Sequence, residues 1–279
     1  MDPIAYILAI IDNWWHPTIR WLHILFAIAW IGPTYLFVRG ARNKLPSTAV
    51  QGARSETWWV HGGYLHVDYE VEALPSDVRV LNWMMWESMM TMVTGMILLK
   101  INYTTAWGHY AQIIGAALIY GLFWWLIKPG SRFEPVGVGL TLIGLTALGH
   151  YFCVQYGPLL GLYYLGATIG TAMVLVNVWL IILPINWLMI RDLRLNRPRN
   201  EVRAQRAFRG TIHNSYVWMT MLILMTSKHH FIVYAPTQRP YWESVAVIVL
   251  IGVLGGHILR RGYIGRTLAW FAEQLDLQP

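Results

Sequence analysis

Long apolar runs alternate with short polar breaks along the whole 279-residue chain. Each run is long enough to cross a hydrocarbon core of about 30 Å as an α-helix. Several breaks contain Pro or Gly, which interrupt helices. The pattern predicts an all-α integral membrane protein, with residues 1–279 as a single membrane domain of about seven transmembrane helices in one bundle. The runs lie at residues 18–39, 81–101, 110–128, 136–157, 159–190, 211–230 and 242–260.

The segments outside these runs predict smaller elements. Residues 1–15 lack a basic n-region and an A-x-A cleavage site, so we expect an interfacial helix there. The polar tail 263–279 also fits an interfacial amphipathic segment. The connection 40–80 contains TWWVHGGYLHVDYE, whose alternation and Gly pair favour a small flap, either a β-hairpin or a re-entrant segment. The fifth run is long, so we expect its helix to continue past the membrane or to bend at Pro184.

The distribution of basic residues orients the bundle. The linker 191–209 contains seven Arg and no Lys. If this linker is cytoplasmic, all but four of the 21 Lys and Arg residues fall on the inner side of the membrane. The positive-inside rule then predicts an outer N-terminus, an inner C-terminus and a cytoplasmic flap, in a multi-pass protein of the bacterial inner membrane. The four basic residues left outside are Arg20, Lys100, Lys228 and Arg239.

The composition narrows the possible classes of function. Hydrophobic residues make up 56% and charged residues 13% of the chain, against about 25% charged residues in soluble domains. A single cysteine, Cys153, excludes a disulfide framework, a Cys-ligated zinc site and a CxxCH haem attachment. The net charge of +7 is explained by the cytoplasmic membrane face, so we expect membrane lipids and no nucleic acid as partners.

Three ionisable or ligating side chains are expected at one depth near the inner face. Glu87 lies one to two turns inside the second run, while His213 and His257 each lie about one turn inside a helix end marked by Arg. An ionisable residue inside a membrane segment indicates a functional site by default. His61 and His66 belong to the flap, which we expect to close over this inner site.

A second group of histidines is expected near the outer face. His23 lies one turn inside Arg20, and His150 lies about two turns inside Pro158. Neutral imidazole is the usual axial ligand of b-type haem, and two His on facing helices can hold the iron. The available redox centres are therefore haem b or a His/carboxylate-bound metal. An interfacial position fits the remaining four: His16, His109, His229 and His230.

Each of these residues also has a purely structural interpretation. A single His inside a helix often only hydrogen-bonds a neighbouring carbonyl, and Glu87 would act as structural glue by pairing with His213 or a Trp indole. The abundant Trp and Met fit the core and the aromatic belt. The Arg-rich linker 191–209 fits a solvated, lipid-facing segment or a docking surface for a soluble partner. The convergence of three groups at one depth favours the functional interpretation.

Five blocks of the sequence, in the same order and covering nearly the whole chain, resemble the membrane domain of the cytochrome c-linked bacterial urate hydroxylases, the urate oxidase N-terminal family. Seven residues fall on motif positions of that family: His23, His61, Glu87, His213, Asn214, Tyr216 and His257. The blocks are RWLHILFAIAWIGPTYLF (20–37), WWVHGGYLH (58–66), NWMMWESMMTMVTGMILL (82–99), GATIGTAMVLVNVWLIILP (166–184) and IHNSYVWMTMLILMTSKHH (212–230).

The resemblance implies a multi-helix membrane oxidoreductase that passes electrons to a c-type cytochrome. The sequence departs from the family pattern in three ways. It ends where the family continues into a C-terminal cytochrome c, which implies a separate cytochrome subunit. Tyr164 stands where the family has a His, and Gly256 precedes His257 where the family has an Arg. These two changes leave urate open as the substrate.

We therefore expect a membrane-embedded redox subunit that contains haem b or a His-held metal. It would exchange electrons with a separate c-type cytochrome, another redox subunit or quinone. In its most specific form it is urate hydroxylase-like: a purine enters from the cytoplasmic side, Glu87 takes or relays a proton, and electrons leave through an outer centre near His23 and His150. The alternative, of another class, is a cofactor-free subunit that anchors a larger complex.

The expected roles divide the candidate residues into two sets, with His66 and Tyr164 as additional candidates. Catalytic roles are expected for Glu87, His61, Asn214 and Tyr216. Ligation of haem iron or another metal is expected for His23, His150, His213 and His257.

Overall fold

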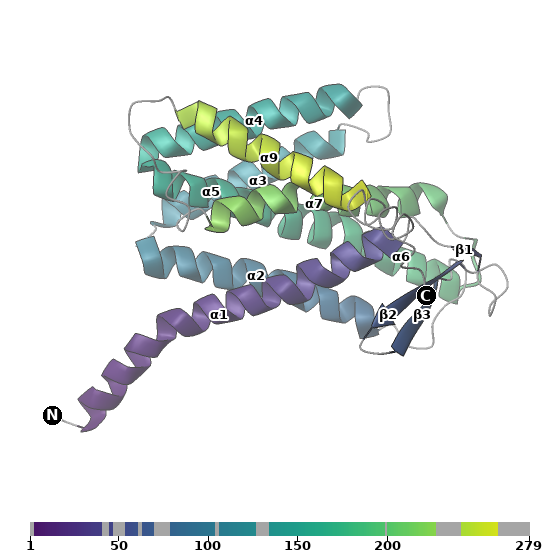
Figure 1. Cartoon of the computed structure of the whole chain (residues 1–279), viewed down its shortest axis with the longest axis horizontal. Helices are drawn as coiled ribbons and strands as arrows, with labels where there is room; N and C mark the ends of the chain where they lie inside the picture. Colours follow the sequence, from purple (N-terminus) through teal and green to yellow (C-terminus); the bar gives the residue numbers. More distant parts are fainter. Residues whose placement is uncertain are drawn as a thin grey trace, which may run out of the picture.

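The computed structural model describes residues 3–40, 45–46, 54–60, 63–69, 79–103, 106–126, 134–198, 200–226 and 241–261. Nearly all of this part of the chain is helical (Figure 1). The helices are α1 (Pro3–Gly40), α2 (Arg79–Tyr103), α3 (Trp107–Leu126), α4 (Glu134–Tyr156), α5 (Pro158–Thr171), the π-helix η1 (Ala172–Ile182), α6 (Leu183–Arg194), α7 (Glu201–Thr226) and α9 (Tyr241–Arg261).

The centre of the bundle is formed by α5 and η1. The α5 helix contacts α3, α4 and α7, and η1 contacts α2, α3 and α7. Most residues of these two segments are buried, including Tyr164, Leu165 and Ile169, which are fully covered. The pair α1–α2 lies along one side of this centre, and α4 and α9 lie together on the other (Figure 1). The mainly apolar sequence of 158–182 thus forms much of the core, because other helices cover most of its residues.

The first helix is longer than the sequence predicts. We expect an interfacial helix at 1–15 and a separate transmembrane run from residue 18, but α1 is one helix of 38 residues from Pro3 to Gly40. Pro17 and Pro33 lie inside it. A proline removes one backbone hydrogen bond and bends a helix more often than it ends one when neighbouring turns are intact. Figure 1 shows α1 curving away from the bundle toward its N-terminus.

Three of the described helical segments are long and apolar enough to cross a membrane: Val136–Tyr156, Pro158–Arg194 and Tyr241–Leu259. The chain is therefore a membrane protein on length and composition. The sequence predicts seven such helices, and only three of the described segments meet this description. The helices α1, α2, α3 and α7 coincide with the other predicted runs, but they carry more Trp, Tyr, His, Ser and Thr, which lower their mean hydropathy.

The fifth predicted run continues through three segments without a break. From Pro158 to Arg194 the chain passes from α5 into η1 and then α6. At the end of η1 the Leu183 amide donates to the carbonyl of Val178, five residues back. Pro184 follows in the first turn of α6, where a missing N–H is tolerated. The fifth run is thus one helical segment of 37 residues, and its irregular part precedes Pro184.

The segment after α1 contains the hairpin that the alternating sequence predicts. The strands β1 (Leu45–Pro46), β2 (Arg54–Val60) and β3 (Gly63–Tyr69) form an antiparallel sheet in the order β1-β2-β3. In the β2–β3 register Trp58 pairs with Leu65, and Thr57 pairs with His66.

The Arg-rich segment 191–209 is mostly helical, in contrast to the solvated linker expected there. The α6 helix extends to Arg194, and α7 already begins at Glu201. The Asn200 side chain accepts the Arg203 amide at 3.1 Å and so caps α7. Asp192, which is buried, accepts the Arg203 guanidinium at 2.9 Å and lies 3.7 Å from two further arginines, Arg191 and Arg197. The turn between α6 and α7 is therefore fixed by ionic contacts.

Small residues allow α9 to pack closely on α7. A Cβ at Gly252 would lie 2.5 Å from the Cα of Thr220, and a Cβ at Gly256 would lie 2.8 Å from the carbonyl oxygen of Tyr216. Glycines four residues apart lie on one face of a helix and let two backbones approach, as in the small-xxx-small pattern of membrane helices. This contact fixes the C-terminal half of α9, including His257, against α7.

Candidate functional site

His23 is held in one orientation by the facing helix α2. Its Nδ1 lies 2.9 Å from the Thr91 carbonyl oxygen and 3.1 Å from the Thr94 hydroxyl oxygen. A carbonyl oxygen only accepts, so Nδ1 carries the hydrogen and donates it to Thr91. Thr94 itself donates to the Met90 carbonyl at 2.6 Å. The other ring nitrogen, Nε2, therefore keeps its lone pair and is a potential metal ligand or hydrogen-bond acceptor.

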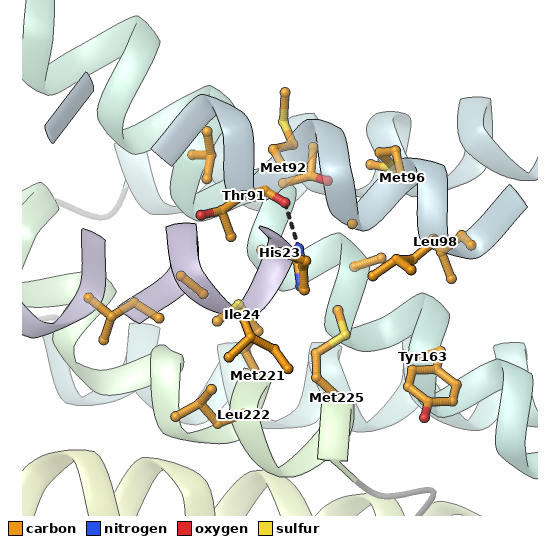
Figure 2. A pocket seen from close by; sticks show the side chains of 18 of the residues that line it. His23, Ile24, Thr91, Met92, Met96, Leu98, Tyr163, Met221, Leu222 and Met225 are labelled. Carbon is orange, nitrogen blue, oxygen red and sulfur yellow. Dashed lines mark hydrogen bonds between the residues drawn. The ribbon is translucent and has the colours of Figure 1, made fainter. Parts of the chain in front are cut away.

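The His23 ring faces a cavity of about 610 Å³ between α1, α2, α5 and α7. Its walls are mainly apolar and include four thioethers, from Met92, Met96, Met221 and Met225 (Figure 2). Thr171 lines it too, and the Thr171 hydroxyl is buried without a hydrogen-bond partner among the described residues. The size, the apolar walls and the imidazole together fit a flat, largely apolar group of the dimensions that cofactor sites take.

His213 lies in a separate, fully satisfied network. Asn177 of η1 donates from Nδ2 to His213 Nδ1 at 2.7 Å and to Asn214 Oδ1 at 2.6 Å. Because Nδ1 accepts, Nε2 carries the hydrogen and donates it to the Tyr120 hydroxyl oxygen at 2.7 Å. The Trp124 ring covers the imidazole, with 4.4 Å between ring centroids. All of this network is buried inside the bundle.

The expected role of His213 as a metal ligand does not agree with this arrangement. Nε2 carries the hydrogen and the lone pair of Nδ1 accepts from Asn177, so neither ring nitrogen is free to bind a metal. Asn214 lines a small cavity of about 20 Å³ with Trp30, Ile31 and Trp218, and the same three residues also line the large cavity. The polar network therefore lies just beyond the end of the His23 cavity that Trp30, Ile31 and Trp218 form.

His257 contacts Tyr216 and not His213. Its Nδ1 lies 3.0 Å from the Tyr216 hydroxyl, and the two rings stack at a centroid distance of 5.7 Å. Tyr216 and His213 both belong to α7 but have different partners. Tyr216 contacts α9, whereas His213 contacts α3 and η1. The predicted inner constellation is thus divided into two sets of contacts.

Glu87 is partly buried on α2, one turn before Thr91. Its Oε2 atom is buried and has no hydrogen-bond partner in the described part of the chain. The structural interpretation gives Glu87 either His213 or a Trp indole as its partner. His213 is excluded because both of its nitrogens are taken by other groups, and Oε2 has no indole partner among the described residues. The neighbouring Trp86 packs edge-on against Trp179 of η1 at 6.3 Å. Glu87 thus presents a buried carboxylate oxygen without the pairing that normally stabilises one.

His23 and His150 do not form the expected pair of ligands. His150 belongs to α4, which packs on α5 and α9, and no residue of α4 lines the cavity of His23. The His150 Nδ1 is buried without a hydrogen-bond partner among the residues that the structure describes. His150 is therefore a separate feature of the α4 side of the bundle.

Tyr164, which stands where the family pattern has a His, is the centre of an aromatic cluster. Its hydroxyl hydrogen-bonds His109 Nδ1 at 2.7 Å, and its ring packs edge-on against Phe152 and Tyr156. His109, expected only at the interface, thus has a buried partner. His16 likewise hydrogen-bonds Asn102 on α2.

The flap candidates are not placed relative to the site. His61 lies outside the described residues, as do His229 and His230, and nothing is described of the His66 side chain. Within the described ranges, no three His, Cys, Asp or Glu side chains come together as a metal site. The alternative of a His/carboxylate-bound metal therefore has no ligand cluster there.

The network contains two residues that the sequence interpretation missed. Tyr120 and Asn177 are 93 and 36 residues away from His213 in the chain, and their partnership is visible only in three dimensions. A polar Asn within the strongly apolar stretch AMVLVNVWLII is the signal that identifies Asn177.

The fold and these sites define a helical membrane protein with a histidine-lined cavity and a buried polar network. The family model described as urate oxidase N-terminal matches residues 9–114 and 109–274. The chain therefore belongs to the urate oxidase N-terminal family, as the five sequence blocks predict. Searches of curated proteins and of solved structures gave no match.

Proposed function

We propose that the chain is the membrane-embedded redox subunit of a urate hydroxylase-like oxidoreductase, and that the cavity beside His23 holds a b-type haem. The family membership supports the class of reaction. The observation that carries the haem assignment is the His23 geometry: Nδ1–H is bound to the Thr91 carbonyl, so Nε2 keeps its lone pair on a ring that lines the cavity.

The donor set around His23 fits haem iron. Metal-ligating histidines almost always donate their other ring N–H to a carbonyl or carboxylate, which fixes the tautomer and raises ligand basicity. His23 does this with Thr91, and the glycine at 95 leaves room for its ring. A single imidazole in an apolar pocket is a sufficient protein ligand for haem. Haem b would supply one-electron redox chemistry at this position.

The polar groups beyond the apolar end of the cavity would manage the proton that accompanies oxidation of a purine. Glu87 has a buried oxygen without a partner, and such a carboxylate can accept a proton from a substrate or relay one. The His213–Asn177–Asn214 network would position this end of the site without ligating a metal. Tyr216 and His257 form a second polar pair that would contact substrate nearer the inner face.

The proposal includes the orientation of the chain in a bacterial inner membrane. The proposal adds crossings by α1, α2, α3 and α7 to the three apolar segments, and with the Arg-rich α6–α7 turn inside, these seven crossings would place the N-terminus outside and the C-terminus inside. The His23 cavity then lies toward the outer face, where a separate c-type cytochrome would accept electrons, with quinone as the other acceptor.

We propose urate or a related purine as the substrate, although the chain departs from the family pattern at two positions, Tyr164 and Gly256. Tyr164 is engaged with His109 in an aromatic cluster, so it acts there as a packing residue. At Gly256 even a Cβ would lie within 2.8 Å of the α7 backbone, so an arginine would force α9 away from α7. The anion-binding arginine of the family pattern therefore has no equivalent at this position.

A reduced-minus-oxidised spectrum of the purified full-length chain tests the proposal. We expect a b-type α-band that disappears in His23→Ala and persists in His213→Ala. Addition of urate should reduce the haem in the wild-type chain. A colourless preparation contradicts the redox function and favours the cofactor-free anchoring subunit. A haem that urate cannot reduce contradicts the substrate and leaves electron transfer in place.

A further inference from the structure

The cavity beside His23 is polar at one end and apolar at the other. Antiparallel helices bring the first lining residue of α1 and the last lining residues of α2 and α7 to the same end. That end is formed by Arg20, Asn102, Tyr103, Tyr163 and Thr226. The opposite end is formed by Ile31, Gly32, Val174 and Trp218. The chemistry of the walls therefore gives any bound ligand a preferred direction.

Arg20 is the charged residue of this cavity. No Asp or Glu is found among the residues that line it, and Arg20 has no ion pair with any described residue. Arg20 and His23 are three residues apart on α1, so they lie on one face of the helix about 4.5 Å apart along its axis. A ligand held at His23 Nε2 therefore has Arg20 beside one of its edges.

The neighbours of Arg20 favour an anion and supply hydrogen-bond donors. Asn102 is held at this end by its hydrogen bond with His16, and the Tyr103 and Tyr163 rings pack at a centroid distance of 5.4 Å. A guanidinium at the entrance of a low-dielectric cavity attracts negative charge and forms charge-assisted, bidentate hydrogen bonds with carboxylates. The apolar end offers no comparable group.

We propose that Arg20 binds the carboxylates of the ligand and so orients it, with its anionic edge at the outer entrance and its apolar edge between Val174 and Trp218. The ligand is thus an amphiphile with a flat apolar body and a carboxylate-bearing edge, which is the chemistry of haem b and its two propionates. This inference rests on the proposed function, because it assigns the orientation of the group that His23 holds. Arg20 is a positioning residue.

The test compares haem b with its dimethyl ester, in which both carboxylates are capped. The full-length chain, produced without haem, is titrated in detergent with each probe, and the Arg20→Gln and Arg20→Lys variants are treated in the same way. Arg206→Gln is the matched control, since Arg206 is an exposed arginine of α7 that does not line the cavity.

We expect the wild-type chain to bind haem b about five- to tenfold more tightly than the ester. Arg20→Gln should lose this preference by weakening haem b alone, Arg20→Lys should keep part of it, and Arg206→Gln should keep all of it. The midpoint potential of bound haem b should fall in Arg20→Gln, because a nearby positive charge is removed.

Equal affinity of the wild-type chain for both probes overturns the inference, and this comparison needs no variant to fold. Equal weakening of both probes by Arg20→Gln also overturns it. If an anionic purine is what Arg20 binds, urate will displace haem b in the wild-type chain and esterification will have no effect. Loss of both probes in His23→Ala tests the proposed function separately, so the two failures are distinguishable.

Discussion

The imidazole of His23 occupies the space that a side chain at residue 95 would need. A Cβ on Gly95 would lie 2.9 Å from Cε1 and 3.4 Å from Nδ1 of His23. The glycine of α2 and the histidine of α1 are therefore a matched pair, and the hydrogen bond from His23 to Thr91 depends on it.

Gly95→Ala should displace the His23 ring and weaken its hydrogen bond with Thr91. We expect the haem content of the purified chain to fall severalfold, because the ring can no longer present Nε2 in the same direction. Haem per chain, measured by absorbance against protein, checks this. Gly115→Ala on α3 is the control, since nothing lies within 4 Å of a Cβ there. This control should retain haem and gain up to about 1 kcal/mol in stability. Equal haem content in the two variants contradicts the pairing.

His213→Leu should destabilise the bundle and leave the haem of His23 in place. The substitution removes the partner of Tyr120 and Asn177 and leaves their buried polar groups unsatisfied, at about 1–3 kcal/mol each. Thermal unfolding in detergent measures the loss. If the His213→Leu chain folds but has lost its b-type spectrum, His213 is a haem ligand after all. That result would contradict the hydrogen bonds described above.

Gly252→Ala should separate α9 from α7. The added methyl group meets the backbone of Thr220, which cannot rotate away, so we expect a cost of about 1–3 kcal/mol. Gly255→Ala is the matched control, because its Cβ would meet only the flexible Met219 side chain, at 3.3 Å. Thermal unfolding of the two variants in the same detergent provides the comparison. Equal stability of the two variants means that α7 and α9 are not packed as closely as described.

Asp192→Asn should loosen the turn between α6 and α7. Three arginines share this carboxylate, and the amide retains a hydrogen bond but no charge. Because the arginines are 39% to 61% exposed, we expect a loss of only about 1–2 kcal/mol. The loss should shrink at high salt, since screening weakens the wild-type contacts. Trypsin cleavage after these arginines should become faster in the variant. An unchanged cleavage rate contradicts the role of Asp192.

Glu87→Gln should remove catalysis and spare the cofactor. The amide has nearly the same shape but cannot accept a proton, so urate-dependent reduction of an added c-type cytochrome should fall about 10²–10⁴-fold. The b-type spectrum should be unchanged. Ser88→Ala is the control, since this buried neighbour bonds only to the Met85 carbonyl. Full activity in Glu87→Gln would contradict a catalytic role and leave Glu87 with a packing role only.

The sequence predicts most helices of the fold because apolar runs and their breaks mark them directly. It does not predict the continuity of α1, because the interfacial segment 1–15 and the apolar run from residue 18 are assigned to separate helices, whereas one helix contains both and Pro17 between them. It also misses the start of α7 within the Arg-rich segment, where Asn200 gives a capping signal and Arg is a good helix former.

For the candidate site the sequence predicts only the depth of each residue along its helix and not the direction in which its side chain points. Counting turns from a helix end gives the level of His213 and His257, and this level says nothing about the neighbour that each side chain faces. His213 faces Tyr120 and Asn177, while His257 faces Tyr216. His23 is identified from sequence, but its Thr91 partner and the cavity require the packing of α1 on α2.

The number of residues in the π-helix η1 determines which side chains of α5 and η1 face the site. In a π-helix an amide pairs five residues back, as Leu183 does with Val178, so the segment holds more residues per turn than the α-helices on either side. Deleting one residue between Ala172 and Asn177 would let the segment relax toward an α-helix and turn α5 by about 100° relative to α6. Asn177 would then lose His213, or Thr171 would leave the cavity. Insertions and deletions, which most membrane helices absorb at their ends, are therefore excluded from these 11 residues.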